Sequence, residues 1–117
     1  MLWQDSATGH WHALLHNLEG PHMCYGQLCQ VGIHAFSRDG DHWTNGGTAY
    51  TNAVTFTNGR TLVLNRRERP HLVFAKGTTV PVALSNSASP GGPSGVGGQV
   101  PTGGDFSFTL VQAVRQK

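Results

Sequence analysis

The segment 66–74, Arg-Arg-Glu-Arg-Pro-His-Leu-Val-Phe, holds the residues of this chain that are best suited to chemistry. It contains four of the chain's fourteen charged residues, and Glu68 is one of only two glutamates. A lone carboxylate among guanidinium groups at the end of a strand can form a polar binding site or donate a proton. The alternative is a surface salt-bridge cluster on an edge strand, which would contribute little to stability.

The residues next to Glu68 influence the charge around its carboxylate and the conformation of the strand that carries it. Strand alternation predicts that Arg67 and Arg69 face away from Glu68, which limits their effect on it. Pro70 cannot donate a ladder hydrogen bond, so we expect it to interrupt strand pairing and to favour an extended conformation at Arg69.

Histidine is unusually frequent, with seven residues in the chain. His10, His12 and His16 share one face of an extended segment, because side chains alternate along a strand. The His-x-His spacing can chelate zinc. Further candidate ligands follow in the sequence: His22, Cys24, Cys29 and His34. The alternative, which we favour, is a polar strand face whose histidines form hydrogen bonds, so we assign no metal and no cofactor.

The two cysteines flank a short segment that contains Gly26. A disulfide between Cys24 and Cys29 is feasible, and two free thiols are an equally open alternative. The N-terminus shows no basic and apolar leader of the kind that directs secretion, so the sequence leaves the compartment undecided.

The three tryptophans, Trp3, Trp11 and Trp43, could stack on the apolar faces of sugars. Tryptophan near the start of a strand more often belongs to the core. We therefore expect Trp11 and Trp43 to be mostly buried and Trp3 to be exposed.

The remaining pattern predicts an all-β chain with many turns. Asn58-Gly59 between two β-rich runs is a strong hairpin signal, and no segment keeps a helical period. Short strands at this spacing indicate a sandwich, barrel or propeller. The predicted strands span 11–16, 30–36, 53–57, 61–64, 71–74, 79–84 and 106–112.

One domain is expected over 1–117, with a flexible loop over 86–104. That loop belongs to a serine-, glycine- and proline-rich stretch that begins at Ser85 and offers almost nothing to bury. The formal net charge of +2 is too small and too scattered for nucleic-acid binding, and no apolar run is long enough to span a membrane.

The segment 37–43, Ser-Arg-Asp-Gly-Asp-His-Trp, predicts a tight hairpin turn. Ser37 or Asp39 can accept hydrogen bonds from the turn's backbone amides. Trp43 can then fold back on the hairpin as its apolar anchor. A catalytic role for Asp39 or Asp41 is the weaker interpretation.

This Ser-x-Asp-Gly-x-x-Trp hairpin resembles the blade hairpin of five-bladed β-propeller glycoside hydrolases of families 43 and 32. It is also similar to the Asp-box of sialidases, with one residue fewer between Asp39 and Trp43. The segment 2–14 resembles a blade opening of the same group, 67–72 resembles its Glu-x-Pro-His element, and 105–112 is similar to a closing strand.

The resemblance implies the C-terminal part of a propeller, about two blades long, that lacks the remaining blades. It implies that Glu68 corresponds to the general acid and faces carbohydrate. We expect the substrate-binding patch to include His16, His34, Arg67 and Trp3. It also favours a secreted protein, and a fragment with open edges would require partner blades or a homo-oligomer.

Glycoside hydrolysis requires two carboxyl groups. Only Asp5 and Glu19 remain as acids outside obvious turns or loop ends, so we expect hydrolysis only in a full-length parent. Two alternatives stay open. One is a non-catalytic β module that binds glycan or a protein partner, and the other is a small β domain stabilised by zinc.

Overall fold

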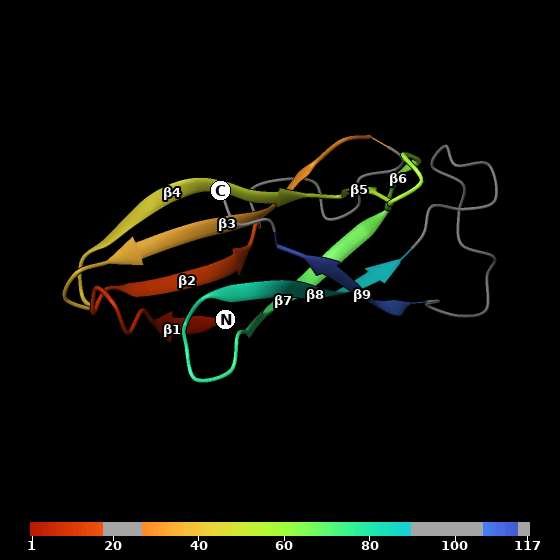
Figure 1. Ribbon diagram of the computed structural model, residues 1–117. Coiled ribbons are helices and arrows are strands. Elements are labelled where there is room, and N and C mark those ends of the chain that lie inside the picture. Colours follow the sequence, from red (N-terminus) through yellow and green to blue (C-terminus); the bar gives the residue numbers. More distant parts are fainter. Residues whose placement is uncertain (18–26, 90–106, 115–117) are drawn as a thin grey trace.

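The computed structural model describes residues 1–17, 27–89 and 107–114. Over these residues the chain is all-β, as the sequence predicts, with nine strands in three antiparallel sheets and no helix (Figure 1). None of the three sheets closes into a barrel. No helix in the described part is long and apolar enough to cross a membrane.

The N-terminal sheet has four strands, and each pairs with the next in sequence. They are β1 (Leu2–Gln4), β2 (Trp11–His16), β3 (Gln30–Ser37) and β4 (Trp43–Thr51). The sequence analysis did not predict β1 or β4 as a strand. β4 contains Asn45, Gly46 and Gly47, which have low strand propensity, and pairing with β3 overrides that preference.

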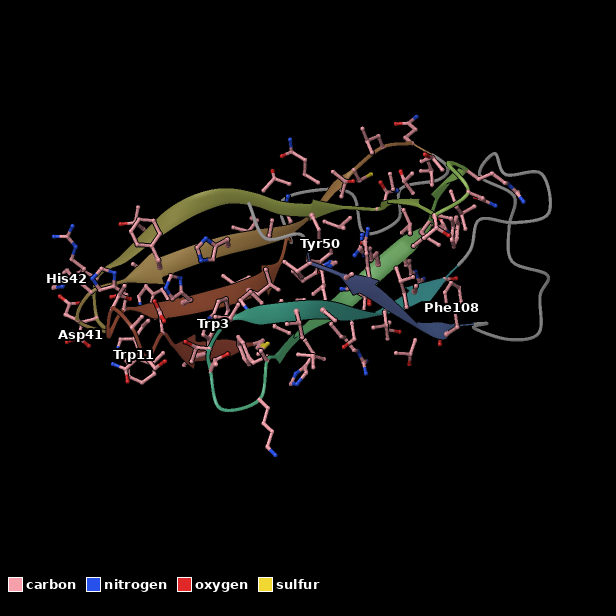
Figure 2. All side chains as sticks on the ribbon, viewed as in Figure 1. Trp3, Trp11, Asp41, His42, Tyr50 and Phe108 are labelled. Atoms are coloured by element: carbon pink, nitrogen blue, oxygen red, sulfur yellow. The ribbon has the colours of Figure 1, made fainter. Side chains whose placement is uncertain are left out.

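The turn between β3 and β4 has the predicted chemistry. Ser37 Oγ accepts hydrogen bonds from the amides of Asp39 and Gly40, and Asp39 Oδ1 accepts from the amides of Asp41 and His42. Trp43 Nε1 donates to the Gly40 carbonyl at 2.9 Å, so the indole ties the hairpin together. Figure 2 shows Trp11, Asp41 and His42 at this tip of the sheet.

The Asn58-Gly59 hairpin is also confirmed. It joins β5 (Ala53–Thr55) to β6 (Thr61–Val63), and Gly59 has a φ of 81° that suits glycine.

The C-terminal sheet contains β7 (Arg66–Phe74), β8 (Pro81–Ser89) and β9 (Phe108–Ala113) in that order. The predicted loop over 86–104 was wrong over residues 86–89, because these continue β8: Ser87 and Ala88 pair with both β7 and β9, Asn86 with β9 and Ser89 with β7. Asn86 and Ala88 are buried and alternate with half-buried serines on this strand. The burial of these two side chains stabilises the strand although its residues have low strand propensity. The predicted loop beyond residue 89 lies outside the described residues.

A bulge interrupts the pairing of β7 with β8. Glu68 pairs with Ser87 and His71 with Ser85, so Arg69 and Pro70 together face the single residue Asn86. The predicted interruption at Pro70 is therefore confirmed. The predicted extended conformation at Arg69 was wrong: its φ of 53° is left-handed, because the bulge forces the backbone to turn there.

The main core lies between the N-terminal and C-terminal sheets. It consists of Leu14, Val31, Tyr50, Leu72 and Leu84, which come from β2, β3, β4, β7 and β8. The Tyr50 ring lies on Gly32, where any Cβ would overlap it. A second cluster joins Val54, Leu64 and Ala88. The core packing brings β2 against β7.

Candidate functional site

In the described part of the chain Glu68 forms no salt bridge with the arginines beside it, so the salt-bridge cluster that was one interpretation of the sequence is not built around this carboxylate. Arg67 points inward and is only 2% exposed. Neither Glu68 nor Arg69 makes a side-chain hydrogen bond or ion pair with another residue in the described part of the chain. Their charges are therefore available to a ligand.

Arg67 is bonded entirely within the protein. Its Nε donates to Asn86 Oδ1 at 2.9 Å, Nη1 to the Thr51 carbonyl at 3.0 Å and Nη2 to Gln112 Oε1 at 2.9 Å. Its guanidinium carbon lies 4.7 Å from the centre of the Tyr50 ring, a cation–π distance. Burial lowers the pKa of Arg67. Because its donors are used within the protein, we do not include Arg67 in the candidate binding site, although the sequence predicted that it binds substrate.

Glu68 lies where two cavities meet. The larger is a groove of about 570 Å³ between β2 and β7. Its lining comprises Met1, Leu14, Leu15, His16, Glu68, Arg69, Pro70 and His71. The smaller cavity, about 200 Å³, lies beyond Glu68 on the C-terminal sheet. Its lining comprises Arg66, Glu68, Arg69, Ser87, Ala88, Ser89 and Ser107.

His16 lines the larger groove together with Glu68. The sequence analysis had placed these two residues in one carbohydrate-facing patch. The Nδ1 atom of His16 is buried and has no hydrogen-bond partner among the described residues. A buried imidazole nitrogen without a partner is costly.

His34 and Trp3 lie elsewhere, in a row of rings on the N-terminal sheet. Trp3 stacks on His12 with ring centres 5.2 Å apart, and the rings of His12 and His34 stack at the same distance. Phe36 and Phe74 extend the row at its two ends. His12 Nδ1 and His34 Nε2 are 2.9 Å apart and form a hydrogen bond, in which either ring nitrogen can be the donor. Neither His34 nor Trp3 lines the larger groove.

The predicted exposure of the tryptophans was wrong for two of the three. Trp3, labelled in Figure 2, is half-buried and packs against the main core. Trp43 is 41% exposed although its ring nitrogen is bonded, because β4 is an edge strand with little packed over it.

Acidification should destabilise the protein through His34. Burial, and then the charge of His12, lowers the pKa of His34. The contribution of neutral His34 is therefore complete above about pH 6.5, the unfolded value, and is lost as the pH falls through the lower folded pKa. We expect the melting temperature to fall between pH 7 and pH 5, and to fall less in His34→Gln.

The exposed His71 provides the matched control, and His71→Gln should keep the full dependence. Asp5 does not interfere in this range, because hydrogen bonds from Ala7, Thr8 and Thr79 lower its pKa to about 2. An unchanged pH profile in His34→Gln, measured by differential scanning fluorimetry, would contradict the assignment.

The zinc ligand candidates that the structure describes do not form a site with three or more ligands. Among the described residues no three histidine, cysteine, aspartate or glutamate side chains form a group that could hold a metal ion. His12 pairs with His34 rather than with His10 and His16. His22 and Cys24 lie outside the described residues, and Cys29 is disulfide-bonded.

A second carboxylate beside Glu68 is also missing from the described linings of both cavities. Asp5 accepts hydrogen bonds from Ala7 and Thr8 in the turn after β1 and from Thr79 just before β8, so it serves to hold that turn. Glu19 lies outside the described residues. The sequence-based patch omitted Arg69, His71 and the serines of β8. The signal for Arg69 was a proline inside a strand, which indicates a bulge.

A scan against protein-family models matches no family, and no curated protein and no solved structure matches the chain. The case for a function therefore rests on the groove beside Glu68.

Proposed function

We propose that the groove beside Glu68 binds carbohydrate, in a chain that forms part of a glycoside hydrolase-like β-propeller. The observation that carries this proposal is the unpaired carboxylate of Glu68 at the edge of a largely apolar groove of about 570 Å³. That volume lies within the range of small-molecule sites, about 300–1,000 Å³.

The lining of the groove matches the two surfaces of a sugar ring. Leu14, Leu15 and Pro70 offer an apolar surface to the C–H face. Glu68 can accept hydrogen bonds from two hydroxyl groups, and charge-assisted bonds of this kind are about twice as strong as neutral ones. His16 and His71 add polar groups on the two sides of the groove.

The strand order of the N-terminal sheet supports the propeller part of the proposal. Four antiparallel strands, each beside the next in sequence, are the arrangement of a propeller blade. The C-terminal sheet supplies three more strands and would form a second blade. The apolar core between them resembles the packing of neighbouring blades.

The same site favours binding over hydrolysis in this chain. Both hydrolytic mechanisms use two carboxyl groups, about 5–5.5 Å or about 6.5–9.5 Å apart. Within the described linings Glu68 is the only carboxylate. We therefore propose a non-catalytic glycan-binding role for the isolated chain. Hydrolysis, with Glu68 as the acid, would require a carboxylate from another part of a complete propeller.

Binding should depend on Glu68 and should occur without turnover. We expect a glycan array to give positive oligosaccharides and Glu68→Gln to weaken the best of them about fivefold to tenfold, because charge-assisted hydrogen bonds are lost. Isothermal titration calorimetry measures the change. Aryl glycosides should not be hydrolysed by the wild-type chain.

Asp41→Asn is the matched control, because Asp41 is an exposed acid at the far tip of the N-terminal sheet. It should bind as the wild type does. The proposal fails if no glycan binds, or if Glu68→Gln and Asp41→Asn bind equally well.

A further inference from the structure

Both faces of the N-terminal sheet carry apolar side chains, and the main core uses one of them. Leu14 of β2 points into that core. Side chains alternate along a strand, so Trp11, Ala13 and Leu15 point to the opposite face. Directly paired residues share a face, so the register extends this outer face to the neighbouring strands. From β1 to β3 its apolar side chains are Leu2, Trp11, Ala13, Leu15, Ile33 and Ala35.

The outer face is uncharged and open to water. Over the paired residues of β1 to β4 it carries no charged side chain, and Trp43 extends it at the β4 edge, opposite Ser37. Leu2 is 59% exposed and Leu15 is 46% exposed. An antiparallel sheet face that stays in water usually carries polar side chains. A face without charge, with exposed apolar side chains, is typical of the centre of a protein interface.

We propose that two copies of this chain associate through the outer face as a symmetric dimer, with one N-terminal sheet packed face to face on the other. Ala13 and Ala35, which pair with each other across β2 and β3, lie at the centre of the contact. The charged residues of the tip turn, Arg38, Asp39 and Asp41, lie at its rim. The dimer does not depend on the proposed function of the groove.

A second copy is the partner that this chemistry fits. A two-fold axis places a surface against itself, so an uncharged face meets no charge of its own sign. The outward face of the C-terminal sheet is a poorer partner, because it carries Glu68, and burying an unpaired carboxylate is costly. The longest stretch outside the described residues, 90–106, supplies only three large apolar side chains, those of Val96, Val100 and Phe106.

The size of the outer face predicts a weak dimer. Four strands about 4.8 Å apart, each at most about six residues long over this face, give an outline of about 400 Å² per copy. Protruding side chains add to this flat outline. Stable complexes bury about 800 Å² on each partner, so the contact lies at the small end of the range. We therefore expect a dissociation constant of about 10–100 µM.

Sedimentation velocity between about 1 and about 200 µM tests the dimer. We expect the wild type to change from monomer to dimer over this range. Ile33→Glu, on the interior strand β3, and Leu2→Glu, on β1, should each raise the dissociation constant at least about tenfold, because the symmetry brings two new carboxylates into one interface.

Val111→Glu is the matched control. Val111 is 62% exposed and lies on β9 opposite Ser85, on the C-terminal sheet. This variant should dimerise as the wild type does. Thermal melting shows whether each variant is folded, and Leu2→Glu, which alters an exposed side chain, decides the question by itself if Ile33→Glu does not fold.

Three results would overturn the proposal. The first is a wild type that stays monomeric up to about 200 µM. The second is a dimer that survives in folded Ile33→Glu, because pairing through an edge strand would not involve this face of β3. The third is a dimer that Val111→Glu weakens as much as Leu2→Glu does. Neither Leu2 nor Ile33 lines the cavities beside Glu68, so both variants should keep wild-type glycan binding whatever the outcome.

Discussion

Replacing Arg67 by alanine should lower the free energy of unfolding by about 2–4 kcal/mol, the largest effect expected of any charged residue here. The substitution leaves Asn86 Oδ1 and the Thr51 carbonyl without their donor, and both lie at buried or partly buried positions. It also removes the guanidinium from the Tyr50 ring. Urea denaturation followed by circular dichroism measures the change.

Arg67→Lys separates charge from geometry. Lysine keeps the positive charge but has no planar fork, so it cannot reach three acceptors in three directions. We expect it to recover less than half of the loss. Arg38→Ala, an exposed arginine, should change stability by no more than about 0.5 kcal/mol. A loss in Arg67→Ala as small as in Arg38→Ala would show that the internal bonds of Arg67 add nothing.

Arg67 also explains how Glu68 is held. Asn86 accepts a hydrogen bond from Arg67 and donates one of 3.3 Å to the Glu68 carbonyl. Asn86 stands opposite the bulge, where the ladder leaves backbone groups unpaired. The buried arginine and this amide therefore fix the strand immediately before the bulge, and the bulge directs Arg69 toward the ligand side.

Strand positions were predictable where the side chains themselves favour strands. Trp11–His16 matches β2 end for end, because it is a short, mostly apolar run with apolar side chains at the alternate positions Trp11, Ala13 and Leu15. β4 and the end of β8 were not predicted, because their residues do not favour strands. Their glycines, asparagines and serines carry little intrinsic preference, and pairing with a neighbouring strand decides their structure.

The site was predictable only as far as strand alternation holds. Alternation correctly sends Arg67 to the face opposite Glu68, where it is buried. It fails at Arg69, because the two-residue bulge returns that side chain to the cavities of Glu68. The contact of His16 with the same groove depends on β2 packing against β7, which no local pattern encodes.

Replacing Asn52 by alanine should destabilise the protein by about 2–4 kcal/mol, since Asn52 is fully buried and its side chain joins three segments. Its Oδ1 accepts from the Cys29 amide at 2.8 Å, and its Nδ2 donates to the carbonyls of Gln27 and Leu64 at 2.8 and 2.7 Å. Alanine would leave these backbone groups without their side-chain partner.

Asn45→Ala, on β4, controls for the loss of an asparagine side chain; Asn52 itself lies in the bend between β4 and β5. Asn45 is exposed and accepts one bond from the Gly47 amide, so its loss should cost no more than about 0.5 kcal/mol. Equal urea midpoints for the two variants would contradict the role of Asn52. Because Asn52 links the residues just before β3 to those just before β7, its loss should also loosen the groove. We therefore expect Asn52→Ala to weaken glycan binding although Asn52 lines neither cavity.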